Sequence, residues 1–308
     1  MSFTAQDVKA LREKTGVGMM KCKEALTESN GDMQKAIDIL REKGLATSQK
    51  KSGRTAAEGA VVAYNDTEKN IAVLLEINSE TDFVGKNEKF VDFANNVAKI
   101  IADNEPADVE SLLDTQYDSD KRTVKENLTD LVMVIGENIQ IRRFEIIKGI
   151  VSDYVHTGGS VGVLVKFEIP EDKKDTPEFK ELGQDIAMQV AAMNPSYLCS
   201  DEVPEDVKKH EQEIIMSQMK EDPKMANKPD NVLENIAKGK LNKFFKESCL
   251  VDQEFVKEPK FDVKSHVASV AKSLGTQISI EKFVRYERGE GIEKKAEDFA
   301  EEIKKLQS

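Results

Sequence analysis

The sequence predicts an α+β fold with four parts: an N-terminal three-helix domain, a duplicated hairpin-plus-helix α+β core, a projecting antiparallel helical hairpin and a C-terminal helix. The main observation is a repeat. A β-hairpin pattern followed by an amphipathic helix occurs twice, with an offset of 90 residues at Tyr64 and Tyr154 and of 89 at Pro106 and Pro195. Elsewhere, apolar residues recur at the three- and four-residue spacing of helices.

Three short helices are predicted over residues 3–45. Thr4 can cap the first helix, and Gly16 and Gly18 break it. The second covers about 20–28 and ends near Gly31. Asp32 can cap the third, and Gly44 is its predicted end. The third helix carries one apolar stripe at helical spacing: Met33, Ala36, Ile37 and Leu40.

The segment that follows is polar and basic and lacks large apolar side chains. We interpret residues 47–55 as a linker. For the first half of this segment, an extension of the third helix is an equally good interpretation.

Each copy of the repeat has a strand rich in β-branched residues after a polar turn. These strands cover 71–77 in the first copy and 161–167 in the second, where Gly158 and Gly159 supply the turn. A helix follows each strand, with apolar residues Phe90, Phe93, Ala94, Val97 and Ile101 in one and Phe179, Leu182, Ile186, Ala187, Val190 and Ala191 in the other. A further helix (124–135) and strand (139–147) separate the copies.

Two helices are predicted over residues 205–220 and 231–246, joined by a turn that contains Pro223 and Pro229. Their apolar stripe is thin, so this hairpin projects as an arm. A last predicted helix has an apolar seam that must pack against another surface: Ile292, Ala296, Phe299, Ile303 and Leu306. The expected domains are 1–46, a linker at 47–55, core halves at 56–147 and at 148–201 with 249–287, the arm at 202–248, and a C-terminal module at 288–308.

Composition limits the function. The 308 residues carry a formal net charge of −12, which disfavours phosphate backbones and anionic lipid as partners. We therefore expect no membrane and no direct nucleic acid contact, although Lys50, Lys51 and Arg54 form a local basic patch. No apolar run is long enough to cross a bilayer, and no secretory signal begins the chain. Three scattered cysteines are typical of reduced thiols, so the expected location is cytoplasmic.

Catalytic patterns are missing from the sequence. His156, His210 and His266 lie far apart, and none has a second ligand at metal-binding spacing. Neither a phosphate-binding loop nor a nucleophile elbow is present. We expect a binding protein that is not an enzyme, with no cofactor and no metal.

The connection 80–87 stands out, because Thr81, Asp82, Phe83 and Val84 place an apolar pair in a polar loop. Phe83 could fold back into the core, or it could form an aromatic wedge directed at a partner. The second copy has Glu171 and Asp172 at the same place and no aromatic residue. A loop that differs on a repeated scaffold favours a functional role.

Several motifs in order resemble the bacterial translation elongation factor Ts family over nearly the whole chain. They are the residues 81–84 within 78–86; 11–26, which contains Val17, Gly18, Met19 and Met20; 30–44; 135–138; 142–144; 154–165; 241–244; 255–256; and 289–293. One departure is Ser160, where the family often has arginine.

The resemblance implies a guanine-nucleotide-exchange factor that releases GDP from elongation factor Tu. It implies that the N-terminal domain is ubiquitin-associated-like and touches the GTPase through Val17, Gly18, Met19 and Met20. By the same resemblance, the Asp82–Phe83 loop enters the GTPase domain and disturbs the Mg²⁺ and phosphate site, while the region of His156 contacts another domain. The implied partner is elongation factor Tu, either GDP-bound or nucleotide-free. The resemblance does not decide whether the protein forms a homodimer through the arm.

Two other functions remain as alternatives. One is a non-catalytic adaptor that binds a ubiquitin-like or peptide partner through the three-helix domain. The other is a hydrolase that uses His156 with a distant carboxylate, since such groups can assemble from remote segments.

Overall fold

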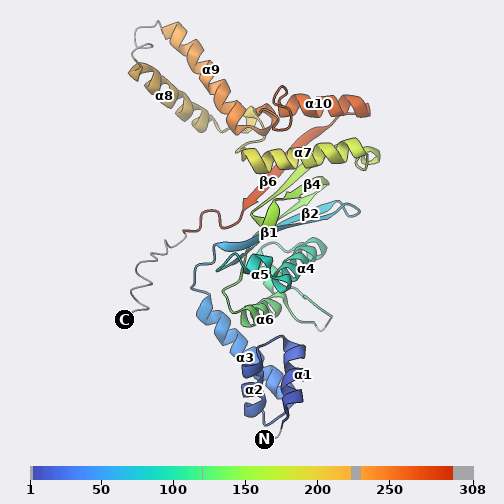
Figure 1. Cartoon of the computed structure of the whole chain (residues 1–308). Coiled ribbons are helices and arrows are strands. Elements are labelled where there is room, and N and C mark those ends of the chain that lie inside the picture. Colours follow the sequence, from blue (N-terminus) through green and yellow to red (C-terminus); the bar gives the residue numbers. More distant parts are fainter. Residues whose placement is uncertain (1–2, 120, 223–229, 294–308) are drawn as a thin grey trace.

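The computed structural model describes residues 3–119, 121–222 and 230–293. It confirms the α+β class: helices flank two antiparallel sheets of three strands each. Figure 1 shows an elongated molecule, with a three-helix unit at one end, the sheets in the middle and a helical arm at the other end. No described helix is long and apolar enough to cross a membrane.

The three-helix unit consists of α1 (Ala5–Thr15), α2 (Met19–Glu28) and α3 (Met33–Lys51). Thr4 and Asp7 form a capping box, and Gly16 ends α1 in the left-handed conformation, as the sequence predicts. Asp32 caps α3 through the Lys35 amide at 3.0 Å. The apolar faces of the three helices meet in one cluster.

Helix α3 does not end at Gly44, so that prediction is wrong. A Cβ at Gly44 would lie 3.0 Å from Met133 Sδ, because α3 packs closely against helix α6 there. Gly44 thus serves helix packing and not termination. The helix continues to Lys51, which leaves 52–57 as the connection, and Met133 joins the core of the three-helix unit. The first half of the predicted linker is therefore helical.

The first half of the core is built from strands β1 (Glu58–Asp66), β2 (Ile71–Ser79) and β3 (Gln140–Lys148) in the order β1-β2-β3. Helices α4 (Glu88–Asn104), α5 (Val109–Leu113) and α6 (Val124–Ile135) lie on one side of this sheet (Figure 1). The 3₁₀ helix η1 (Val84–Lys86) connects β2 to α4.

The second half repeats this plan. Its strands are β4 (Ile150–Val155), β5 (Val161–Glu168) and β6 (Ser279–Glu287), in the order β4-β5-β6. Its helices are α7 (Pro177–Met193) and α10 (Val263–Leu274). The short 3₁₀ helices are η2 (Thr157–Gly159), η3 (Glu171–Lys173), η4 (Ser200–Glu202) and η5 (Leu250–Asp252).

The duplication extends further than the hairpin and helix that the sequence revealed. Strand β2 has a bulge at Glu76/Ile77, and β5 has one 90 residues later, at Lys166/Phe167. Helix α10 and strand β6 follow α6 and β3 with an offset of 139 residues at their first positions (263 − 124 and 279 − 140). Their role as the second copy is not predicted from the sequence, because about 50 inserted residues break the register.

The insertion is the arm, an antiparallel pair of α8 (Glu205–Glu221) and α9 (Asp230–Ser248). It has its own small apolar cluster, formed by Ile215, Met219, Leu233 and Ala237. The two sheets pack face to face through Val61, Ala72, Leu74, Ile147, Val151 and Leu164. The predicted C-terminal helix lies almost entirely outside the described residues, which end in a turn at 288–293.

Candidate functional site

The connection after β2 exposes one aromatic ring. Phe83 has helical backbone angles and is 79% exposed, more than any other large hydrophobic side chain among the described residues. The interpretation in which Phe83 folds back into the core is therefore wrong. Asp82 beside it is also exposed and lies 3.8 Å from Lys86, an ion pair that contributes little at such exposure.

The residues on either side of Phe83 are fastened. Val84 is 5% exposed and packs into the core, and a Cβ at Gly85 would lie 2.6 Å from the carbonyl oxygen of Gly59. Since no larger residue fits at Gly85, the loop lies directly on strand β1. Val84 therefore anchors the loop from within and offers no surface to a partner.

The other flank is held by the turn between α6 and β3. The Thr81 amide and hydroxyl donate to the Glu137 carboxylate at 2.9 and 2.6 Å, and the Asn138 amide donates to Glu80 at 2.6 Å. Hydrogen bonds to charged groups are the stronger class. Sequence reasoning noticed Glu137 and Asn138 only as part of a motif and did not predict that they brace the loop.

His156 lies at the turn between β4 and β5, and it is exposed. Its Nδ1 lies 3.0 Å from the Tyr154 hydroxyl. The adjoining Gly159 has a φ of 69°, and a Cβ there would lie 2.7 Å from Ala60 Cβ, so this turn also rests on β1. The turns η1 and η2 contact each other. The structure thus brings His156 and the Asp82–Phe83 loop to the same end of the core.

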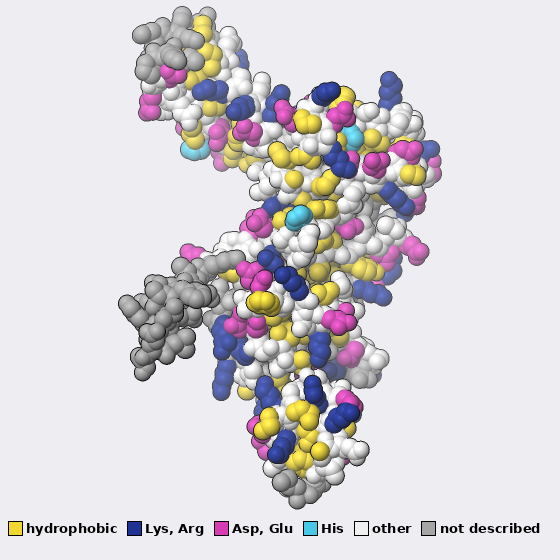
Figure 2. Space-filling view, viewed as in Figure 1, with side chains coloured by type: hydrophobic (Ala, Val, Ile, Leu, Met, Phe, Trp, Pro, Cys, Tyr) yellow, Lys and Arg dark blue, Asp and Glu magenta, His cyan; other side chains and the backbone are white. Residues whose placement is uncertain are grey.

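The N-terminal candidates separate into two groups. Met19 and Met20 are 42% and 66% exposed at the start of α2, and Gly18 before them is exposed as well. Val17 is only 4% exposed and belongs to the core of the three-helix unit, so its side chain cannot reach a partner here. Figure 2 shows hydrophobic side chains interspersed with Lys and Arg on this unit.

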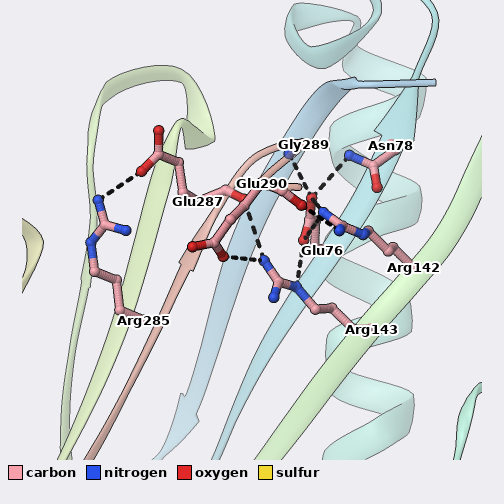
Figure 3. A network of polar contacts seen from close by, with 8 residues as sticks. All are labelled: Glu76, Asn78, Arg142, Arg143, Arg285, Glu287, Gly289 and Glu290. Carbon is pink, nitrogen blue, oxygen red and sulfur yellow. Dashed lines mark hydrogen bonds and ion pairs between the residues drawn. The ribbon is translucent and has the colours of Figure 1, made fainter. Parts of the chain in front are cut away.

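A buried ionic network lies behind the site, and no sequence signal that we used predicts it. Glu76, fully buried in β2, accepts hydrogen bonds from Arg142 Nη1 (3.0 Å), Arg143 Nε (2.6 Å) and the Gly289 amide (2.7 Å) (Figure 3). Burial alone would raise the pKa of Glu76. The hydrogen bonds from Gly289, Asn78 and the two arginines outweigh burial and hold this pKa below its usual range.

The network links the two halves. Gly289 and Glu290 follow β6 of the second half, and Arg143 pairs with Glu290 at 3.0 Å and lies 4.1 Å from the centre of the Tyr286 ring. Next to it, Arg288 donates to the Gly59 carbonyl, the group on which Gly85 rests. The frame beneath Phe83 is thus held from both halves.

Metal-binding clusters and histidine–carboxylate pairs were sought around these residues. In the part of the chain that the structure describes, no group of three or more His, Cys, Asp or Glu side chains could hold a metal ion. His266 is the histidine nearest a carboxylate, 3.9 Å from Asp185, and His156 has no ion pair among the described residues.

Comparisons with a family model and with individual curated proteins point to the same family. The family model described as "Elongation factor TS" matches residues 80–290. Similar curated proteins are each named "Elongation factor Ts". One from Clostridium novyi (strain NT) is 48% identical over 306 residues, one from Clostridium kluyveri (strain NBRC 12016) is 47% identical over 307, and one from Clostridium botulinum (strain Okra / Type B1) is 45% identical over 307. Each match covers 98% of both chains.

Proposed function

Because this chain belongs to the elongation factor Ts family, we propose that it is a guanine-nucleotide-exchange factor that promotes GDP release from elongation factor Tu during translation elongation. One observation carries the proposal: Phe83 is 79% exposed on a loop whose two flanks are fastened. A large exposed aromatic side chain held in one position is suited to fill a pocket in a partner.

The exchange works through coupled binding. The GTPase holds GDP through its phosphate loop and a bound Mg²⁺. The Asp82–Phe83 loop enters the GTPase domain and binds best to a conformation in which those elements are displaced. By reciprocity, a protein that prefers that conformation lowers the affinity for nucleotide by the factor by which nucleotide lowers its own affinity.

The braced loop reduces the entropic cost of this binding. Thr81 and Val84 are already ordered in the free protein, so only the exposed side chains of Asp82 and Phe83 lose freedom when the partner binds. Burial of one Phe side chain contributes about 2–3 kcal/mol, which corresponds to a loosening of nucleotide of about a hundredfold.

An acceleration of GDP release beyond about a hundredfold needs further contacts with the GTPase. We assign this to two further surfaces, the exposed Gly18, Met19 and Met20 of the three-helix unit and the turn at His156. Both bind the GTPase without entering its nucleotide site, in GDP-bound and nucleotide-free states. No covalent bond is made or broken in this function, and the cytoplasm is where it takes place.

The test is GDP release from elongation factor Tu by stopped flow. We expect Phe83→Ala to lower the exchange rate about a hundredfold at subsaturating factor, because the wedge is lost. Phe261→Ala is the matched control, since Phe261 is 47% exposed in the second half of the core and is not part of the proposed contact. Equal rates for the two variants, with both melting curves unchanged, would refute the wedge.

The adaptor alternative uses the same exposed Met19 and Met20. A pull-down from bacterial extract separates the two functions. An exchange factor enriches one nucleotide-free GTPase and loses it when GDP is added, whereas an adaptor retains its partner regardless of nucleotide.

A further inference from the structure

Helix α6 has apolar side chains on both of its faces. Its last five residues, 131–135, are all apolar, although a helix on the surface of a protein usually has a single apolar stripe. Leu131 and Val132 belong to the apolar core of the first half. Met133 belongs to the apolar cluster of the three-helix unit, and Val134 packs against that cluster. The helix therefore packs against the core on one face and against the three-helix unit on the other.

Two glycines of the three-helix unit lie directly on α6. A Cβ at Gly44 of α3 would lie 3.0 Å from Met133 Sδ, and a Cβ at Gly16 would lie 3.6 Å from Val134 Cγ2. Gly16 ends α1, and α2 with its two exposed methionines begins three residues later. Because close packing leaves little room for movement, α6 fixes the position of these methionines relative to the core.

The C-terminal end of the same helix holds the loop that carries Phe83. Gly136 ends α6, and its carbonyl accepts a hydrogen bond from Lys51 at the end of α3. The next residue is Glu137, whose carboxylate accepts two hydrogen bonds from Thr81, at 2.9 and 2.6 Å. Phe83 follows Thr81 by two residues, so a short and ordered connection joins α6 to the exposed ring.

We propose that α6 couples the two surfaces that bind the GTPase, and that Met133 and Val134 are positioning residues for nucleotide exchange. This inference rests on the exchange function proposed above. Both residues hold the three-helix unit, while Glu137 at the end of the same helix holds the loop. The methionines of α2 and the ring of Phe83 therefore meet the partner as one preformed surface. Once one contact forms, the other has a high effective concentration, which raises the affinity without any new contact.

Gly44→Leu tests the coupling in the full-length protein. A leucine at this position does not fit beside Met133, so α3 is displaced from α6 and the three-helix unit loses its single position on the core. Gly239→Leu is the matched control, because Gly239 also lies within a helix and a Cβ there would have no close neighbour within 4 Å. Addition of Met133→Ala to Gly44→Leu vacates the space, and it should restore the wild-type behaviour because the two residues are in contact.

The first measurement is the distance between the three-helix unit and the core in the free protein. Spin labels are attached at Gln6→Cys of α1 and Lys99→Cys of α4, both of which are exposed positions. The background is Cys199→Ser, in which the two remaining cysteines are buried. We expect one narrow distance distribution for the wild type, for Gly239→Leu and for the double variant, and a broad distribution for Gly44→Leu.

The second measurement is GDP release by stopped flow. We expect Gly44→Leu to raise the factor concentration that gives half-maximal release about tenfold, because the two contacts no longer reinforce each other. The maximal rate should stay unchanged, since the wedge at Phe83 is intact. Val134→Ala removes methyl groups that face Gly16 and should act in the same direction to a smaller degree. It tests the same contact if circular dichroism shows that Gly44→Leu does not fold.

Two results would overturn the proposal. A narrow distribution for Gly44→Leu, identical to that of its control, would show that α6 does not hold the units together. A broad distribution with an unchanged half-maximal concentration would show that the position of the three-helix unit does not matter to the partner. A wild-type protein that fails to accelerate GDP release would instead refute the exchange function, and the distances in the free protein would be unaffected.

Discussion

At the scale of single residues, Glu76 shows how one buried carboxylate can organise a protein. Arg142 and Arg143 donate to it from the neighbouring strand, and the Gly289 amide donates from a segment 213 residues away. An ionised carboxylate is costly to bury unless its oxygens are well paired. Here they are paired, so the charge fixes the position of the chain that leaves β6.

Glu76→Gln should destabilise the protein by about 3 kcal/mol at neutral pH, because Arg142 loses its charged partner and Arg143 keeps only Glu290. The lowered pKa of Glu76 means that its contribution is complete above the unfolded value near 4.5 and is lost as pH falls toward the folded value. The measurement is urea unfolding of both proteins from pH 7 to 3. A stability difference that grows on acidification would contradict this assignment.

Glu137 braces the loop through Thr81, and we expect that it does not touch the partner. Glu137→Ala should slow GDP release less than Phe83→Ala does, because the ring remains but Thr81 loses two hydrogen bonds to a charged group. Stopped-flow exchange at several factor concentrations measures the effect. Glu247→Ala is the control, since its surface pair with Lys243 is 3.6 Å long and weak. A loss as large as that of Phe83→Ala would show that Glu137 itself contacts the GTPase.

At the scale of elements, contacts between helices override local signals. Gly44 is a residue type that often ends a helix, yet α3 continues past it. The reason is that the absence of a side chain at Gly44 leaves room for Met133 of α6. In the same way, α10 and β6 have no continuous repeat signal, because the arm separates them from α7. The structure reveals the repeat despite the insertion, because β6 pairs with β5 as β3 pairs with β2.

We expect that the core folds without the arm, because the arm has an apolar cluster of its own. Its two ends meet at the base, where the Ser196 and Tyr197 amides both donate to the Ser248 carbonyl. Replacement of residues 205–247 by a short Gly-Ser linker should shift the melting temperature of the core by only a few degrees, because the arm's apolar cluster is its own. Loss of the cooperative melt, followed by circular dichroism, would contradict this expectation.

At the scale of the whole molecule, the packing of the halves decides what a partner meets. The sheets stack through one apolar layer, and the turns η1 and η2, one from each half, come together over β1. Asp82, Phe83 and His156 therefore share one end of the core, although His156 lies 73 residues after Phe83 in the sequence (156 − 83). The three-helix unit is attached to this frame by α3 and α6.

The amino-acid sequence alone determined the types of element, the hairpin-and-helix repeat, the caps at Thr4 and Asp32 and the singular loop at 81–84, because each is a pattern of neighbouring residues. Only the tertiary structure decided that Phe83 is exposed while Val84 and Val17 are buried, that α3 runs to Lys51, and that Glu76 collects its partners. These outcomes depend on contacts between segments that are far apart in the chain. The hydrophobic periodicity of neighbouring residues contains no information about the energies of such contacts.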